Sequence, residues 1–150
     1  MPPRRTPSPA VGARYAALAR KDTKPEIRLR QELHRRGMRY RVDKAVPGLP
    51  RRRVDIAFTR VRLAVLVDGC FWHHCPIHGV LPKTNEEWWR WKFSVNQARD
   101  ADTDQRLADL GWRVMRVWEH EEVHAAADRI EAAVRPPLSQ GRDLDTGTSL

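Results

Sequence analysis

The spacing of apolar and polar positions predicts one amphipathic helix early in the chain. Leu29 and Leu33 lie one helical turn apart in the segment that begins with the letters TKPE. Those letters match a capping box, in which Thr23 caps the helix and Glu26 reaches back to it, and Gly37 suits the helix end. We therefore expect a helix that begins after Thr23 and buries the two leucines.

Two short apolar runs predict a β-hairpin. The letters VDIAF at 54–58 and RLAVLVDG at 62–69 are rich in β-branched residues, and a turn at 59–61 separates them. Both runs are apolar enough for strands that are well buried.

The second half of the chain predicts a long helix, a third strand and a last helix. The letters TNEE at 84–87 repeat the capping-box pattern and open a helix over about 85–110, which Gly111 closes. A strand at 112–118 and a helix at 121–134 follow. A strand, a crossover helix and a further strand connect with right-handed parallel geometry, so the last strand should run parallel to the second. The predicted class is α/β, with a mixed sheet flanked by helices.

The two ends of the chain lack this patterning. Residues 1–21 contain four prolines and no acidic residue, and we expect a flexible basic arm there. Residues 136–150 are rich in Pro, Gly, Ser, Thr and Asp and predict a disordered tail. One domain over 22–135 remains. The basic residues of the arm are Arg4, Arg5, Arg14, Arg20 and Lys21.

Charge narrows the range of partners. The net charge of +9 favours a polyanion such as nucleic acid, although a basic composition alone is equally compatible with no such partner. No apolar run approaches the roughly 20 residues needed to span a bilayer, and no secretory signal is recognisable, so we expect a cytoplasmic protein. Cys70 and Cys75, with histidines nearby, then suit metal binding better than a disulfide.

Two acidic residues are candidates for a magnesium site. Asp55 lies inside an apolar strand, and Asp68 ends the next strand of the hairpin. Carboxylates on neighbouring strands can hold Mg²⁺ for phosphodiester hydrolysis, as in the PD-(D/E)xK nucleases. Asp55 could alternatively form a structural salt bridge with one of the arginines at 51–53. His73, just past the second strand, could act as the general base.

Zinc is expected in the same stretch. Cys70, Cys75 and His78 offer three ligands, and His120 after the last strand could supply the fourth. His124 is an alternative fourth ligand. The letters HEEVH at 120–124 also match H-E-x-x-H, which suggests a zinc protease as a competing hypothesis.

Aromatic residues interleave with basic ones, a pattern that suits contact with bases. Phe71 and Trp72 follow Cys70 directly, and the predicted long helix opens with EEWWRWKF. We assign Trp88, Trp112 and Trp118 to the core.

Taken together, these motifs resemble the very-short-patch repair (Vsr) DNA mismatch endonucleases over about residues 14–135. The stretches that carry the resemblance are RKDTKPEIRLRQEL (20–33), VDIAF (54–58), VDGCFWHHCPIHG (67–79), PKTNEEWWRWKFSVNQARD (82–100) and LGWRVMRVWEHE (110–121). The resemblance implies a restriction-endonuclease-like fold with structural zinc. It also implies a Mg²⁺-dependent nick 5′ of the thymine in T:G mismatches that arise from deamination of 5-methylcytosine.

The resemblance also implies roles for individual residues. Asp55 and the Val67 backbone carbonyl would hold Mg²⁺, His73 would be the catalytic histidine, and Glu26 would lie near the metal-bound water. A well-known form of the family has His at the position of Asp68, which here could bind the metal directly. Zinc ligands would be Cys70, Cys75, His78 and His120. DNA contacts would come from Phe71, Trp72, Trp89 and the basic arm, including Arg4, Arg5, Arg14 and Lys21.

Two alternatives to mismatch repair remain open from the sequence. One is a Vsr-like strand-specific or restriction endonuclease that acts on unmismatched or modified DNA. The other is a zinc-braced DNA-binding module without catalysis. In each case we expect a monomer on double-stranded DNA, and for a repair enzyme the partners would be mismatch-repair proteins and a cytosine methyltransferase system.

Overall fold

The structure is a computed structural model that describes residues 2–3, 23–70, 75–77 and 81–135. Several sequence predictions therefore lie outside the described residues. They concern the tail at 136–150, the arm with Arg4, Arg5, Arg14, Arg20 and Lys21, and the residues Phe71, Trp72, His73 and His78.

The core of the fold is a four-stranded mixed sheet in the order β1-β2-β3-β4. Its strands are β1 (Arg41–Val46), β2 (Leu49–Phe58), β3 (Leu63–Asp68) and β4 (Arg113–Trp118). Strand β2 pairs antiparallel with both β1 and β3, whereas β4 pairs parallel with β3. The predicted hairpin and the predicted parallel strand are thus confirmed.

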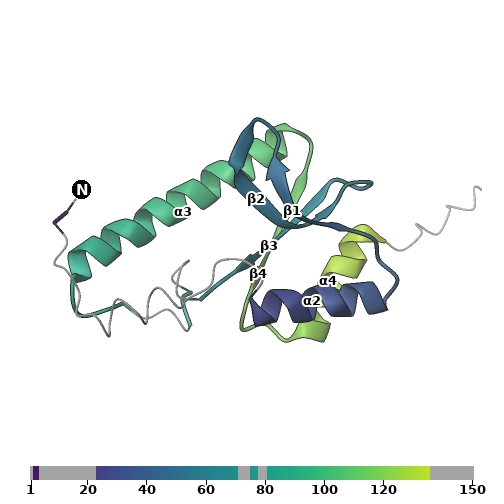
Figure 1. Ribbon diagram of the computed structural model, residues 1–150, viewed down its shortest axis with the longest axis horizontal. Coiled ribbons are helices and arrows are strands. Elements are labelled where there is room, and N and C mark those ends of the chain that lie inside the picture. Colours follow the sequence, from purple (N-terminus) through teal and green to yellow (C-terminus); the bar gives the residue numbers. More distant parts are fainter. Residues whose placement is uncertain (1, 4–22, 71–74, 78–80, 136–150) are drawn as a thin grey trace, which may run out of the picture.

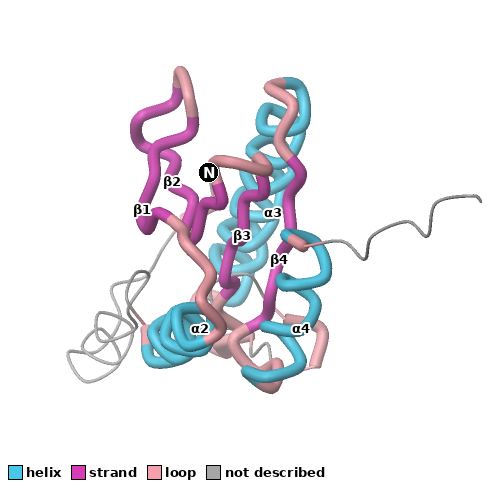
Figure 2. Tube along the Cα trace, turned by 90° about the vertical axis from the view of Figure 1, so that its right-hand side faces the viewer, coloured by secondary structure: helices cyan, strands magenta, loops and turns pink. Residues whose placement is uncertain are grey.

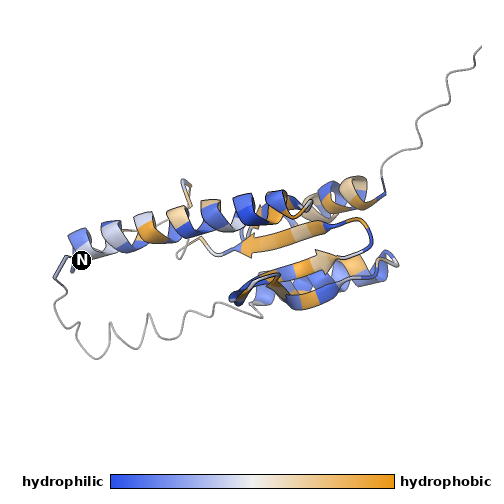
Figure 3. Cartoon of the chain, turned by 90° about the horizontal axis from the view of Figure 1, so that it is seen from above, coloured by the Kyte–Doolittle hydropathy of each residue, from blue (hydrophilic) through white to orange (hydrophobic). Residues whose placement is uncertain are grey.

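Helices cover both faces of the sheet. Helix α3 (Glu86–Asp109) lies on one face, and α2 (Lys24–Arg35) with α4 (Val123–Val134) lies on the other (Figure 1). Seen from above, the long helix α3 is largely hydrophilic along its length (Figure 3). Figure 2 shows the four strands between these two layers. The mixed α/β class predicted from the sequence is confirmed.

The larger apolar cluster lies between the sheet and the α2–α4 layer. Leu33, Ile56, Val65 and Ile130, from both helices and two strands, are completely buried there. A smaller cluster under α3 contains Ala57, Ala64 and Leu107 together with Val46 and Val54. Alternation along β2 and β3 sends successive side chains to these opposite faces.

The caps explain where two helices begin. The Thr23 hydroxyl accepts a hydrogen bond from the Glu26 N–H at 3.4 Å, as the capping box predicts, and Gly37 takes a positive φ of 76° just after α2. The expected cap of α3 by Thr84 is wrong. Asn85 is the N-cap, with φ of 60° and no side-chain capping bond. A left-handed residue there turns the chain sharply into the helix, which leaves the Thr84 hydroxyl no role as cap.

Strand β1 was not predicted. It contains Arg41, Asp43 and Lys44 and lies at the edge of the sheet, and Asp43 has a positive φ of 50°. An edge strand exposed to water needs no apolar alternation, so the pattern gave no signal. Among the described helices, none is both long and apolar enough to cross a membrane.

Candidate active site and metal centre

Asp55 lies where β2 and β3 separate. The last pair of the ladder is Ile56 with Val65, and beyond it the Asp55 Oδ2 accepts a hydrogen bond from the Val67 N–H at 2.8 Å. The carboxylate therefore takes the place of a strand carbonyl as acceptor. This bond holds the Asp55 carboxylate beside the end of β3.

Two of the three arginines that could have paired with Asp55 form ion pairs elsewhere. Arg52 bonds to Asp102 on α3, and Arg53 bonds to Asp43 at 3.2 Å across the β1–β2 hairpin. These pairs hold the arginines along the rim of the site.

Asp68 is buried and bound to Arg116. The Arg116 Nη1 donates to both Asp68 oxygens at 2.9 and 3.1 Å, and its Nε and Nη2 donate to Asp104 on α3. Asp100, one helical turn from Asp104, has a carboxylate oxygen 3.8 Å from Nη1. Burial opposes the charge of Arg116, but the bonds to Asp104 and the charges of Asp68 and Asp100 outweigh it and raise its pKa above the usual value.

A cavity of about 280 Å³ brings these groups together. Asp55, Val67 and Asp68, predicted from sequence to share one site, all line it. Its other polar lining residues are Asp43, Arg51, Arg52, Arg53, Arg99, Asp100, Thr103 and Arg116. Glu26 is buried on α2 and is not among the described residues that line this cavity, so its role stays a prediction.

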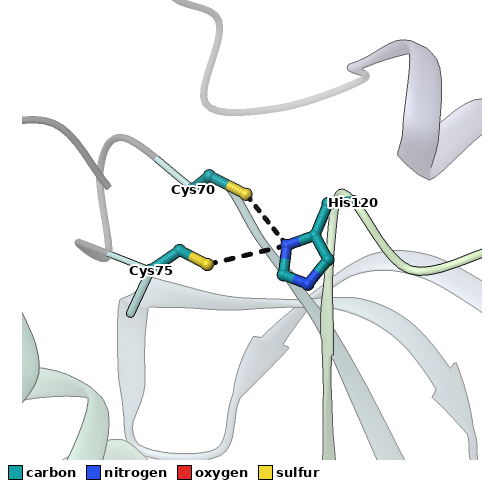
Figure 4. A group of neighbouring side chains, drawn as sticks. All are labelled: Cys70, Cys75 and His120. Carbon is teal, nitrogen blue, oxygen red and sulfur yellow. Dashed lines mark hydrogen bonds between the residues drawn. The ribbon is translucent and has the colours of Figure 1, made fainter. Parts of the chain in front are cut away.

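Cys70, Cys75 and His120 form a second cluster at the ends of β3 and β4 (Figure 4). The His120 Nδ1 lies 3.3 Å from the Cys70 Sγ and 3.6 Å from the Cys75 Sγ. In a tetrahedral zinc site a sulfur and a nitrogen ligand are about 3.5 Å apart, because Zn–S is about 2.3 Å and Zn–N about 2.0 Å. The spacing of the three ligand atoms therefore fits Zn²⁺.

The surroundings of the cluster favour a protonated Cys70 thiol as long as no metal is bound. Burial raises the pKa of the Cys70 thiol to about 12, with further contributions from Cys75 and Glu119, so a bound cation would have to displace the thiol proton. The Glu119 carboxylate accepts from the Cys70 N–H at 2.9 Å, and the Ile77 N–H donates to the Cys75 Sγ at 3.4 Å. The fourth predicted ligand, His78, lies outside the described residues.

His124 does not join this cluster. Its Nδ1 lies 3.3 Å from the buried Glu32 carboxylate on α2, and helix α4 begins only at Val123. His120 and His124 are therefore not one turn apart on a single helix, which contradicts the zinc-protease hypothesis. The alternative site with His124 as the fourth ligand is contradicted by the same contact.

The tryptophan-rich start of α3 is only partly exposed. Trp89 is 4% exposed and packs against Phe93 with ring centroids 5.6 Å apart, whereas Trp88 and Trp91 are half-buried. Trp112 and Trp118, expected in the core, are half-buried too. A DNA contact through Trp89 stays a prediction.

The sequence argument missed Arg116 and its two partners on α3. Arg116 in the middle of the letters WRVMRVW was one signal, because a charge between apolar residues of a strand needs a carboxylate. Asp100 and Asp104, four residues apart on one helical face, were the other. The pairing itself joins Asp68 to a residue 48 positions away, which local patterns do not reveal.

Comparison with solved structures agrees with the fold. The catalytic domain of the homing endonuclease I-Bth0305I is similar with a TM-score of 0.50 at 19% identity, over 75% of this chain and 94% of that domain. The likeness supports the expected restriction-endonuclease-like fold. In this chain the sheet carries, at the ends of β2 and β3, a cavity lined by aspartate and arginine side chains.

Comparison with known sequences gives the family. Residues 12–78 match the family model described as DNA mismatch endonuclease Vsr. The type II nicking enzyme V.NaeI of Lentzea aerocolonigenes is 48% identical, over 71% of this chain and 66% of its own length. V.XorIIP of Xanthomonas oryzae pv. oryzae, also a type II nicking enzyme, is 44% identical over 67% of this chain and 73% of its own length. The DNA mismatch endonuclease Vsr of Escherichia coli K12 is 41% identical over 69% of this chain and 65% of its own length. This chain belongs to the Vsr family of DNA endonucleases, and it spans about two thirds of these relatives.

Proposed function

We propose that this protein nicks one strand of duplex DNA on the 5′ side of the thymine in a T:G mismatch, by Mg²⁺-dependent hydrolysis. The observation that carries the proposal is the Asp55 carboxylate, which accepts from the Val67 N–H and lines a cavity of aspartate and arginine side chains in a chain of this family. The T:G mismatches would arise by deamination of 5-methylcytosine.

The donor set of the cavity fits magnesium. Asp55 offers carboxylate oxygen and Val67 a backbone carbonyl, and Mg²⁺ prefers oxygen ligands. The bound ion would stabilise the charge that develops on the cleaved phosphate. Asp55 and the Val67 carbonyl would hold it, His73 would accept the proton of the attacking water, and Glu26 would orient water nearby.

We infer that the second cluster holds one structural Zn²⁺ through Cys70, Cys75 and His120, with His78 as fourth ligand. Its purpose would be to fix the segment that carries Phe71 and Trp72, so that these aromatic rings enter the duplex as a rigid wedge. Metal analysis should give about one zinc per chain, and Cys70→Ser should lose it and destabilise the segment. A fully active protein without zinc would contradict this role.

The basic arm supplies the remaining contacts in the proposal. Arg4, Arg5, Arg14 and Lys21 would bind DNA from the opposite groove, and a monomer would act alone on the duplex. Mismatch-repair proteins and a cytosine methyltransferase would be its partners.

A second candidate is a nicking endonuclease for a paired or modified site. The names of the type II nicking enzymes among the relatives favour it. The catalytic groups would be the same, so only the substrate separates it from mismatch repair.

The deciding experiment compares T:G duplexes with C:G duplexes, in a panel of sequence and methylation contexts, with Mg²⁺ present. Selective nicking of T:G by the wild type, absent in Asp55→Asn, is the expected result. Equal cutting of paired and mismatched DNA would favour the second candidate. Binding without any nicking would leave the third alternative, a zinc-braced DNA-binding module.

A further inference from the structure

A second cavity, of about 620 Å³, lies at the opposite end of β3 from Asp68. It is bordered by the turn between β2 and β3 and by the segments in which α2 and α4 end, which Figure 1 shows on one side of the molecule. Strand β3 leads from this turn at Leu63 to Asp68 in the catalytic cavity, about 17 Å away at about 3.3 Å per residue. Among the described residues, none lines both cavities, so the two are separate sites.

The lining of this cavity combines apolar side chains with arginines. Met38 and Phe58 are buried, and Val61 and Val134 are half-buried. The charged members of the lining are Arg39, Arg60 and Arg135. No acidic residue is among the described residues that line it. Apolar walls with a few polar groups, in a cavity of roughly 300–1,000 Å³, are typical of sites for small molecules.

Arg135 already has partners within the fold. Its Nη2 donates to the Gly37 carbonyl at 3.4 Å, and its Nη1 lies 3.5 Å from the Glu131 Oε1. These contacts connect the ends of α2 and α4. They also place a positive charge where the carbonyl groups at a helix end carry partial negative charge. Arg135 therefore has a structural role, and the other two arginines remain for a ligand.

Arg39 and Arg60 are exposed, and neither forms an ion pair with a residue in the part of the chain that the structure describes. Arg39 follows α2 and Arg60 lies in the turn between β2 and β3, so the two side chains reach the cavity from different segments. Like charges that line one cavity repel each other, and an anion bound between them would offset that repulsion. The planar guanidinium group matches the oxygens of a phosphate with two parallel hydrogen bonds.

We propose that this cavity binds a mononucleotide, with its phosphate held by Arg39 and Arg60 and its nucleoside against the apolar lining. A base inside a duplex is paired and stacked, so a free nucleotide fits this concave site better than the DNA substrate does. The proposal does not depend on the proposed function, because no residue of the catalytic cavity takes part in it.

The test is calorimetric titration of the zinc-loaded full chain without added Mg²⁺, with adenosine monophosphate (AMP), inorganic phosphate and adenosine as separate probes. AMP should bind with a Kd at or below about 1 mM. Phosphate alone should bind about tenfold more weakly, and adenosine more weakly still, because each offers only part of the contacts. Arg39→Gln and Arg60→Gln should each weaken AMP binding by about tenfold, and the double variant by about 100-fold.

Arg51→Gln is the matched control, because Arg51 is also exposed but lines the catalytic cavity. Its affinity for AMP should stay within about twofold of the wild type. Arg60→Gln should in turn leave the nicking rate unchanged and alter duplex affinity less than Arg51→Gln does. A loss of duplex affinity in Arg60→Gln as large as its loss of AMP affinity would assign the cavity to the DNA surface and overturn the proposal.

Three further results would overturn it: a wild type that binds no AMP, phosphate that binds as tightly as AMP, and an Arg51→Gln variant that loses as much AMP affinity as Arg60→Gln. Thermal unfolding gives a second readout. AMP at about ten times its Kd should raise the Tm of the wild type by a few degrees, because a ligand that binds the folded state stabilises it. The double variant should show no such rise, and an equal rise in both proteins would contradict the site.

Discussion

The sheet face that packs on α2 and α4 is almost wholly apolar, whereas the face under α3 combines small residues with a charged cavity. Both faces come from the same strands. In β2, Ile56 points into the apolar cluster and is completely buried, while its neighbour Asp55 lines the cavity. Strand alternation thus lets one face stabilise the fold while the other carries chemistry. Substitutions at the adjacent positions 55 and 56 should therefore differ: one should lower the nicking rate and the other the free energy of unfolding.

The largest effect is expected on the charged face. Asp55→Asn should lower the nicking rate by about 1000-fold or more, because the carboxylate that would hold Mg²⁺ loses its charge. The free energy of unfolding should change by less than about 1 kcal/mol, since the amide oxygen can still accept from Val67. Single-turnover nicking assays and urea unfolding measure the two quantities. A comparable loss of stability would show that the two faces are not separable.

The next effect concerns the apolar face. Ile56→Ala should lower the free energy of unfolding by about 2–5 kcal/mol, because it leaves a cavity in the main cluster. The nicking rate of the fraction that remains folded should be close to that of the wild type. Urea unfolding and the activity per folded molecule test this. A loss of activity without a loss of stability would contradict the assignment of this face to stability alone.

A smaller effect on stability, dependent on pH, is expected in the ion pairs that join α2 to α4 on the apolar face of the sheet. Hydrogen bonds from Arg35 and Arg36 hold the pKa of Glu32 well below its ordinary value. A lowered pKa in the folded state stabilises above the unfolded pKa, and the stabilisation is lost as pH falls below about 4.3. Glu32→Gln should therefore be less stable than the wild type at pH 7, with a difference that shrinks towards pH 3.

Glu131→Gln is the control for this prediction, because Glu131 also bonds to Arg36 but is 37% exposed on its side chain. It should show a much weaker pH dependence. An unchanged stability gap between Glu32→Gln and the wild type across this pH range would argue against the network as the cause.

The smallest effect concerns the rim of the charged face. Arg51 is exposed and lines the cavity with Asp55, where it could meet a DNA phosphate. Arg51→Gln should weaken DNA binding a few-fold and reduce the slope of log K against log salt by about 1. Fluorescence anisotropy at several salt concentrations measures the slope. Arg113→Gln, on the side of α4, should leave it unchanged.

The sequence predicted the parts of the fold whose signals are local. The helix capped by Thr23, the hairpin that contains Asp55 and the strand parallel to β3 follow from spacing and turn residues alone. The Cys70, Cys75 and His120 set was predictable because thiols and imidazole share a preference for one metal.

Other features depend on contacts that no local pattern encodes. Strand β1 is polar because it lies at the sheet edge, and Asn85 rather than Thr84 caps α3 because the chain turns left-handed there. The partner of Asp68 is Arg116, on a strand that only the fold brings alongside. His124 faces Glu32 because α4 packs on α2, which the letters HEEVH could not indicate.

The bond between Asp55 and the Val67 N–H has a practical consequence for trapping the protein on uncut DNA. Deletion of the carboxylate by Asp55→Ala would leave a main-chain donor of the sheet unsatisfied next to the substrate, so the trapped state would differ from the native one in backbone as well as in charge. Asp55→Asn keeps an oxygen in place for that donor. An inactive complex made with asparagine should therefore preserve the shape of the strand ends and report how intact DNA is bound before it is cut.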